Sequence, residues 1–297
     1  MKSREITRRE FIKTSALTTA STALFMNSPE KLFAQTKPKS RVVLIRDENA
    51  VLPSGKTNSE VIHKMIDEAV KILFETKDPQ SAWKKIIKPE DVVGIKTNVW
   101  NYLRTPLELE SAIKKRLMEV GVKEENIGIN DRGVLRDPIF QKATTLINAR
   151  PMRTHHWSGV GSLVKNYIMF VPNPSDYHDD SCADLAVIWK LPIVKGKTRL
   201  NILVMLTPLF HSVGPHGFSP EYVWQYKGLI VGIDPVACDA VGLKIIEAKR
   251  KEFFGEDKPL SPPAKHIQLS DLRHKLGNAD MKNIELIFSG FAEGRLI

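Results

Sequence analysis

The sequence predicts an α/β fold, with a mostly parallel sheet that carries helices on both faces in a single large domain. Two observations support this prediction. Short runs of apolar and β-branched residues alternate with segments whose apolar residues recur at helical spacing, which is typical of strands joined by right-handed helical crossovers. In addition, 42% of the residues are hydrophobic and 26% are charged, which is ordinary for a globular protein with a sizeable core.

The first half of the domain shows three strands and two helices in alternation. The first helix begins at Asn58, a favourable N-cap, and places Val61, Met65 and Leu73 on one face. The second helix ends before Gly121, because glycine readily adopts the left-handed conformation that closes helices. The predicted elements are a strand at 41–46, a helix at 58–75, a strand at 92–96, a helix at 107–120 and a strand at 126–130.

The second half continues the alternation less regularly. An apolar strand at 228–233 runs into Asp234 and Pro235, which together predict a helix N-terminus, because Asp caps free amide groups and Pro fits the first helical position. No glycine-rich nucleotide-binding fingerprint occurs in the sequence. The other predicted elements are a helix at 159–170, a strand at 199–206, a helix at 235–250, a loop at 259–263, a helix at 264–276 and a strand at 284–288.

The N-terminal residues have the pattern of a twin-arginine export signal. Arg8 and Arg9, followed by Phe11, precede a weakly apolar run at 16–26 that is too short and too polar to span a bilayer stably. We expect the twin-arginine translocase as a partner, a periplasmic location and no stable membrane span after cleavage. A chance Arg-Arg pair and an uncleaved anchor are the alternatives. The predicted division is a signal peptide at 1–34, a linker at 35–40 and an α/β domain at 41–297.

Charge and cysteine content narrow the function classes. The formal net charge is +10, which favours anionic ligands or an anionic membrane or wall surface. The lysines are scattered rather than gathered into a patch, so we expect no nucleic-acid partner. Only two cysteines occur, too few for a four-cysteine iron-sulfur cluster, and none is expected. A disulfide between Cys182 and Cys238 is an alternative to the two buried free thiols that we favour.

Five of the eight histidines fall between residues 153 and 239. Ligands of an open α/β sheet collect beyond the carboxyl ends of its strands, so residues distant in sequence can meet there. Imidazole and carboxylate groups suit one divalent metal ion, for which His178, His211 and His216 are candidate ligands. Each histidine taken alone also fits a structural or exposed role. No serine-nucleophile motif is present.

Two lysines occupy positions suited to ligand contact. Lys96 and Asn98 follow a predicted strand, where a sheet of this class binds its ligands. Lys165 and Asn166 lie on the helix predicted at 159–170. A lysine that faces a cleft can hold an anionic group or, when desolvated, act as a base. The alternative for Lys165 is an ordinary surface lysine.

Six segments of the sequence carry a likeness to a known family: residues 93–98, 153–166, 178, 183–185, 214–215 and 228–239. Together, and in this order, they resemble the domain of unknown function 362 family. Thr97 stands where the family usually has proline, and Arg153 where it usually has lysine. Many relatives also carry a ferredoxin-like cysteine module, which this chain lacks. The resemblance implies an α/β fold and a candidate site, but it names no reaction.

The leading hypothesis is an exported, enzyme-like protein with a polar cleft. In it, Lys165 binds an anionic group, His155 or His178 moves protons, and a metal would polarise a substrate oxygen or activate water. The first alternative is a non-catalytic periplasmic protein that binds a metal or ligand or assists maturation. In the second alternative, Asp234 is a helix cap and the histidines stabilise their local loops. The ligand-binding candidates are Lys96, Asn98, Asn166, Asp234 and Asp239.

Overall fold

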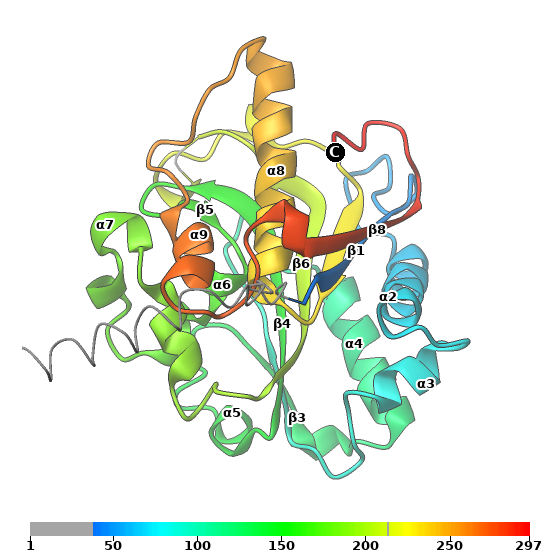
Figure 1. The fold of residues 1–297 in the computed structure, drawn as a ribbon. Coiled ribbons are helices and arrows are strands. Elements are labelled where there is room, and N and C mark those ends of the chain that lie inside the picture. Colours follow the sequence, from blue (N-terminus) through cyan, green and yellow to red (C-terminus); the bar gives the residue numbers. More distant parts are fainter. Residues whose placement is uncertain (1–37, 213) are drawn as a thin grey trace, which may run out of the picture. The chain divides into compact units, whose positions relative to one another are not determined.

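An eight-stranded mixed sheet lies at the centre of the computed structural model (Figure 1). The structure describes residues 38–212 and 214–297. The predicted signal peptide at 1–34, with Arg8, Arg9 and Phe11, therefore lies outside the described residues, as does the first half of the predicted linker, residues 35–37. Residues Lys39–Ile297 form one compact unit. The α/β fold predicted from the sequence is confirmed.

The helices and strands follow one another much as the sequence pattern predicts. The strands are β1 (Ser40–Arg46), β2 (Val93–Lys96), β3 (Ile127–Asn130), β4 (Thr145–His155), β5 (Gly159–Gly161), β6 (Thr198–Leu209), β7 (Gly228–Gly232) and β8 (Ile284–Gly290). The α-helices are α2 (Ser59–Phe74), α3 (Pro79–Lys84), α4 (Leu107–Val120), α5 (Pro138–Lys142), α6 (Leu163–Asn166), α7 (Asp179–Cys182), α8 (Pro235–Phe254) and α9 (Lys265–Leu272).

The sheet is parallel in its centre and mixed at one side. Its strand order is β3-β2-β4-β6-β7-β1-β8, and β5 pairs with β4 alone. Strands β3, β2, β4 and β6 run parallel, as does the pair of β1 and β8. Strand β7 is antiparallel to both of its neighbours. The segment between β6 and β7 contains no α-helix, so no crossover returns the chain to a parallel direction.

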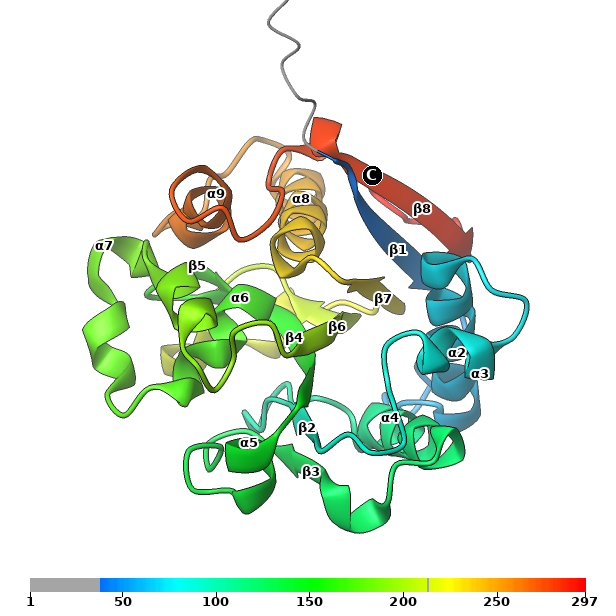
Figure 2. The same cartoon turned by 60° about the horizontal axis from the view of Figure 1, so that its bottom comes forward.

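Helices cover both faces of the sheet. In Figure 2, α2, α3 and α4 gather on one side of it, and α5, α6, α8 and α9 on the other. Strand β1 illustrates the two cores, because its alternate side chains point to opposite faces. Val42 and Leu44 pack with the helices of the α8 side, whereas Val43 and Ile45 pack with those of the α2 side.

Strand β4, missed in the sequence analysis, is the central strand that carries much of the site. All eleven of its residues are buried. Its sequence contains Asn148, Arg150, Pro151 and Arg153, and this mixture of polar residues and proline hides the apolar run that usually marks a buried strand. The polar residues are tolerated in the interior because they line a pocket or bond to one another.

Two helix predictions are wrong in extent. Residues 159–170 were expected to form one helix, but β5 comes first, followed by α6 and a 3-10 helix (Tyr167–Phe170). Gly159 has φ of 70° and starts a strand that pairs with β4, so the helix cannot begin before Ser162. The helix predicted at 264–276 is shorter, because Lys275 adopts φ of 55° and ends it after Leu272.

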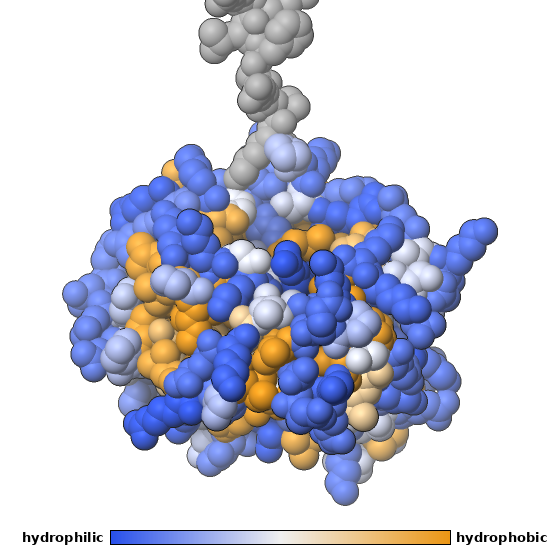
Figure 3. Space-filling view, turned by 90° about the horizontal axis from the view of Figure 1, so that it is seen from below, coloured by the Kyte–Doolittle hydropathy of each residue, from blue (hydrophilic) through white to orange (hydrophobic). Residues whose placement is uncertain are grey.

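The surface shows a mixture of polar and apolar character. The face seen in Figure 3 is largely hydrophilic, with hydrophobic patches in recesses between polar side chains. Among residues 38–212 and 214–297, no helix is both long and apolar enough to cross a membrane.

Candidate functional site

A pocket of about 300 Å³ lies beyond the carboxyl ends of β2 and β3, beside the second half of β4 and α6. The parallel register aligns Lys96 of β2 with Asn130 of β3 and Asn148 of β4, so the residues that follow these positions meet at one edge of the sheet. Six of the sequence-predicted residues lie at or directly beneath this pocket: Lys96, Asn98, His155, Lys165, Asn166 and His178.

Lys96 lies beneath the pocket in a closed network of polar groups. Its side chain is fully buried, and Nζ lies 2.5 Å from Oδ1 of Asp131 and 2.8 Å from the carbonyl oxygen of Thr97. The other carboxylate oxygen of Asp131 accepts a hydrogen bond from the amide of Val99 at 3.0 Å. Asn166 connects this network to α6, with Oδ1 3.3 Å from Lys96 Nζ.

Burial and the attraction between the two opposite charges have opposing effects on the pKa values of Lys96 and Asp131. Burial lowers the pKa of Lys96 to about 8, although the adjacent Asp131 carboxylate raises it. Burial acts on Asp131 to raise its pKa, but the Lys96 ammonium and the Val99 amide outweigh it, so the pKa is lowered. Both groups are therefore charged near neutral pH, and their charges compensate each other.

Lys165 differs from Lys96 in having no carboxylate partner. Its side chain is 3% exposed and lines the pocket, and it forms no ion pair within the described part of the chain. Its hydrogen-bonding partner is the thiol of Cys182, with Nζ 3.4 Å from Sγ. Burial lowers the pKa of Lys165 to about 8, with contributions from the guanidinium groups of Arg150 and Arg153 and against the raising effect of Cys182. Most of this amine therefore carries its proton at pH 7, and a smaller fraction is neutral.

Two buried arginines give the pocket its positive charge. Arg150 and Arg153 are 4% and 3% exposed, and both line the pocket. Arg153 donates from Nη1 to Oδ1 of Asn98 at 3.0 Å and lies over the ring of Trp100 at 4.5 Å. The Nε atoms of both arginines are buried and have no hydrogen-bonding partner among the described residues. Neither guanidinium forms an ion pair there, although the Asp131 carboxylate acts on both at longer range. The two buried positive charges therefore have no direct anionic partner in the described residues.

The glycine at position 161 makes room for one of these arginines. A Cβ atom at Gly161 would collide with Nη2 of Arg150. Strand β5 therefore approaches the guanidinium closely because this position carries no side chain.

Aromatic rings form another wall of the pocket. His178 stacks on Trp157 with ring centroids 3.8 Å apart, and His155 accepts a hydrogen bond from the amide of Trp157 through Nδ1 at 3.2 Å. Burial, with a contribution from Lys165, lowers the pKa of His178 to about 4 and lowers that of His155 as well. Both imidazoles are therefore neutral near pH 7, which suits them as hydrogen-bond acceptors or donors rather than as cations.

The two predicted aspartates serve the backbone and do not line the pocket. Asp239 of α8 accepts hydrogen bonds from the amides of Leu163 and Val164 at 2.8 and 2.9 Å and from Ser162 Oγ at 2.6 Å. It thereby fixes the first residues of α6, which carries Lys165. Burial raises the pKa of Asp239 to about 7, although these three donors lower it. Asp239 is thus a positioning residue rather than a ligand contact.

Asp234 is the N-cap of α8, as one of the sequence hypotheses proposed. Its Oδ1 accepts from the amides of Val236 and Ala237 at 2.8 and 3.1 Å. Its other oxygen lies 2.5 Å from Ser40 Oγ and 2.8 Å from the amide of Asn278. One carboxylate therefore joins α8, the start of β1 and the segment after α9.

The structure does not assemble the three candidate metal ligands into one group. His178 stacks on Trp157, and His216 lies 5.9 Å from the same ring, whereas His211 Nδ1 lies 3.0 Å from Nη1 of Arg250. Within 38–212 and 214–297, no group of three or more His, Cys, Asp or Glu side chains is arranged to hold a metal ion.

Both cysteines are buried free thiols, as the sequence analysis favoured. Cys182 ends a short segment in which Asp180, Ser181 and Cys182 all have positive φ, at 46°, 60° and 61°. Non-glycine residues rarely adopt this conformation, and three in succession represent stored backbone strain. The segment places the Cys182 thiol against the amine of Lys165, and burial raises the pKa of this thiol.

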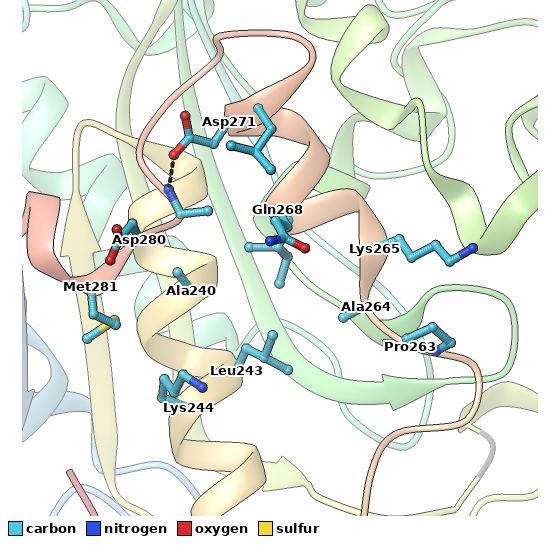
Figure 4. Close-up of a pocket in the computed structure, with 13 residues that line it drawn as sticks. Ala240, Leu243, Lys244, Pro263, Ala264, Lys265, Gln268, Asp271, Asp280 and Met281 are labelled. Atoms are coloured by element: carbon cyan, nitrogen blue, oxygen red, sulfur yellow. Dashed lines mark hydrogen bonds between the residues drawn. The ribbon is translucent and has the colours of Figure 1, made fainter. Parts of the chain in front are cut away.

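A second pocket, of about 490 Å³, lies between α8 and α9 and is shown in Figure 4. Apolar side chains such as Leu243 and Ile267 line much of it, and it contains none of the sequence-predicted site residues. Asp271 accepts a hydrogen bond from the amide of Ala279 at 2.8 Å, which holds the chain that follows α9 (Figure 4). These features fit helix packing better than a chemical site.

Sequence reasoning missed several residues that line the cationic pocket, among them Asp131, Arg150, Arg153 and Trp157. Asp131 directly follows a predicted strand, and a polar residue at that position is a signal that could have found it. Arg150 could not be placed because the strand that contains it was not recognised. Arg153 was noted only as a departure from a family motif. Trp157, an aromatic residue beside two histidines, was quoted within that motif without a role.

The fold and pocket together define the protein as an α/β protein with a cationic site at the carboxyl edge of its parallel strands. Residues 112–244 match the family described as Domain of unknown function (DUF362), which confirms the resemblance predicted from the sequence motifs. The matched segment includes Arg150, Arg153 and Lys165. No curated protein and no solved structure matches the chain.

Proposed function

We propose that this protein binds a small anionic molecule in the pocket around Lys165 and acts on it as an enzyme. The observation that carries the proposal is the presence of Arg150 and Arg153, two buried guanidinium groups without a carboxylate partner in the described part of the chain. Unpaired buried charges cost several kcal/mol each, and an anionic ligand offsets that cost. Carboxylate and phosphate groups match the fork of N–H donors on arginine.

The remaining pocket residues have complementary roles in this proposal. Arg150 and Arg153 hold the anion, and the rings of Trp100 and Trp157 border the rest of the molecule. Lys165 exchanges a proton with the bound molecule, since a lysine whose pKa is about 8 loses and regains its proton near physiological pH. His155 and His178 stay neutral and orient polar groups of the ligand.

A non-catalytic binding protein is the second candidate function. The pocket contains one carboxylate, Asp131, and its two oxygens are already engaged by Lys96 and the Val99 amide. The site therefore has no free carboxylate to act as a base, which favours binding without turnover unless Lys165 supplies the chemistry. The two candidates share the same ligand class and differ only in whether the ligand is converted.

A thermal unfolding screen tests the shared part of both candidates. Purified protein is mixed with phosphate, acetate, pyruvate or lactate at constant ionic strength. A ligand present at about 100 times its Kd stabilises by about 2.7 kcal/mol, which raises the melting temperature by about 5 °C or more. Arg150→Met removes the response, whereas the exposed control Arg136→Met retains it. The proposal fails if no anion stabilises the protein or if Arg150→Met responds like the unchanged protein.

Export and metal dependence are separate proposals. We propose that the protein leaves the cytoplasm through the twin-arginine translocase and works in the periplasm, supported by Arg8, Arg9 and Phe11 in the sequence. Replacing both arginines with lysine should retain the protein in the cytoplasmic fraction.

We propose separately that a divalent metal binds near His178 and His216, where it would be a second reactive group. Elemental analysis of natively exported protein tests for the metal, with His178→Ala as the comparison.

A further inference from the structure

Lys165 has an environment that suits a nucleophile rather than a salt-bridge partner. Its amine lines the pocket, and its side chain is 3% exposed. Its polar neighbour is the thiol of Cys182, a weak hydrogen-bonding group that leaves the nitrogen lone pair accessible. Desolvation and adjacent positive charge, here from Arg150 and Arg153, are the two conditions that activate lysine toward carbonyl groups.

The other buried lysine provides the contrast. Lys96 Nζ lies 2.5 Å from Asp131 Oδ1 and donates to the Thr97 carbonyl as well. Because the Lys96 ammonium is paired with a carboxylate and does not line the pocket, it is not presented to the carbonyl carbon of a bound molecule. The polar network of Lys96 thus fixes the shape of the site, whereas Lys165 remains available for chemistry.

We infer that Lys165 forms an imine with a carbonyl group of the bound anion, which makes a small 2-oxo acid the substrate class. This inference rests on the proposed anion-binding function, because Arg150 and Arg153 must hold the carboxylate next to the carbonyl. In a 2-oxo acid the two groups are directly bonded. When Arg150 and Arg153 hold the carboxylate, the adjacent carbonyl carbon therefore lies toward Lys165. The same two arginines influence the amine of Lys165 electrostatically.

The proposed step is balanced without a cofactor or redox reagent. The neutral amine of Lys165 attacks the carbonyl carbon, a carbon–nitrogen bond forms, and the carbonyl electron pair moves to oxygen. That oxygen takes one proton from the nitrogen and a second from solvent, and it leaves as water when the carbon–oxygen bond breaks. The product is a protonated imine, which can withdraw electrons from an adjacent carbon.

Asp239 positions the nucleophile in this account. Its three hydrogen bonds to Ser162, Leu163 and Val164 fix the start of α6, and Asn148 accepts from Asn166 Nδ2 at 2.8 Å to fix its end. Lys165 is therefore held between two anchored positions. Such preorganisation favours attack on a bound ligand, because little further ordering of the helix is required.

Reductive trapping tests the inference on the full chain. The protein is incubated with pyruvate and sodium cyanoborohydride, which converts an imine into a stable secondary amine, and the modified lysine is located by peptide mass spectrometry. We expect Lys165 to be labelled on the order of 100-fold faster than exposed lysines such as Lys195, because Lys165 lines the pocket in which the arginines hold the acid. Lactate, which keeps the carboxylate but has no ketone, should slow the labelling by competition.

The outcomes separate this inference from the function on which it rests. If Lys165 is labelled and lactate slows the labelling, the result supports both the imine and the anion-binding function. If pyruvate and lactate stabilise the protein equally while Lys165 gains no adduct, the imine is overturned and anion binding stands. If neither acid changes the melting temperature and no adduct forms, both are overturned. Because the wild-type protein is mapped directly, the result does not depend on the folding of a Lys165 variant. Lys165→Gln, with Lys195→Gln as its matched control, then serves to check the assignment.

Discussion

Two buried lysines of this protein occupy opposite kinds of environment. Lys96, at the end of β2, is enclosed by Asp131, the Thr97 carbonyl and Asn166. Lys165, on α6, faces a pocket beside a thiol and two guanidinium groups. Burial lowers the pKa of each to about 8, but only Lys96 has an anion to compensate its charge. Equal burial therefore accompanies a paired ammonium group in one place and, in the other, an amine that lines a pocket without a carboxylate partner.

The largest expected loss in the free energy of unfolding comes from breaking the buried ion pair between Lys96 and Asp131. Asp131→Ala leaves the Lys96 ammonium buried without its carboxylate, and removing one partner of a buried ion pair costs about 3–5 kcal/mol. Urea unfolding followed by circular dichroism measures this loss in the free energy of unfolding. As a control, Glu60→Ala breaks the exposed pair with Lys64 and should cost at most about 0.5 kcal/mol. Equal losses of stability in Asp131→Ala and Glu60→Ala would contradict the distinction between a buried ion pair and an exposed one.

Lys165 should make stability depend on pH in the alkaline range. Its pKa is about 8 in the folded protein, against 10.5 ordinarily, so between these values the unfolded chain holds a proton that the folded chain has released. Stability therefore rises with pH across this window, by about 1 kcal/mol per pH unit for this group. Lys165→Met should remove that contribution and leave the similar one of Lys96. Parallel stability curves for the variant and the wild type between pH 8 and 10.5 would contradict it.

Asp239 should link the stability of α6 to the reactivity of its lysine. Asp239→Asn replaces one acceptor oxygen with an amide group that faces hydrogen-bond donors, which costs about 1–3 kcal/mol. Because α6 is then less well fixed, the labelling of Lys165 should slow as well. Thermal unfolding and the trapping rate, measured on the same preparation, check the two effects. A loss of stability without slower labelling would show that Asp239 does not position Lys165.

The smallest expected effect concerns Asp234, which lies outside the pocket. Asp234→Ala removes the cap of α8 and should cost about 1–2 kcal/mol. Anion binding should remain, since no pocket residue depends directly on this carboxylate. Calorimetric unfolding and titration with pyruvate measure the two properties. Lost binding in a variant that remains folded would return Asp234 to the list of ligand-binding candidates.

Elements governed by local rules could be predicted from the sequence. Asn58 caps α2 through the amide of Val61, and Asp234 caps α8, because both contacts join residues close in sequence. The pairing of Lys96 with Asp131 joins two strand ends and depends on sheet order, which local pattern does not reveal. Lys165 could be nominated as a site residue, but its neighbours Arg150 and Cys182 come from elements whose placement only the fold provides.

The histidine-rich stretch shows what proximity in sequence does not establish. Proximity in sequence grouped His178, His211 and His216 as ligands, yet His211 lies against Arg250 and the rings of Tyr222 and Phe254. The charge that matters at the site comes from arginines, which sit on a strand disguised by its own polar residues. Polar side chains in a buried strand are therefore a signal of a site as well as an obstacle to recognising the strand.

Titration calorimetry with pyruvate, comparing the wild type with Arg150→Met and Arg136→Met at equal ionic strength, tests the central claim most directly. The claim is that Arg150 and Arg153, buried arginines without an ion-pair partner in the described residues, bind the anionic group of the ligand. We predict that Arg150→Met weakens binding by about 10- to 100-fold, the loss expected for a charged hydrogen bond, while Arg136→Met binds like the wild type. Equal affinity of all three proteins for pyruvate would contradict the claim.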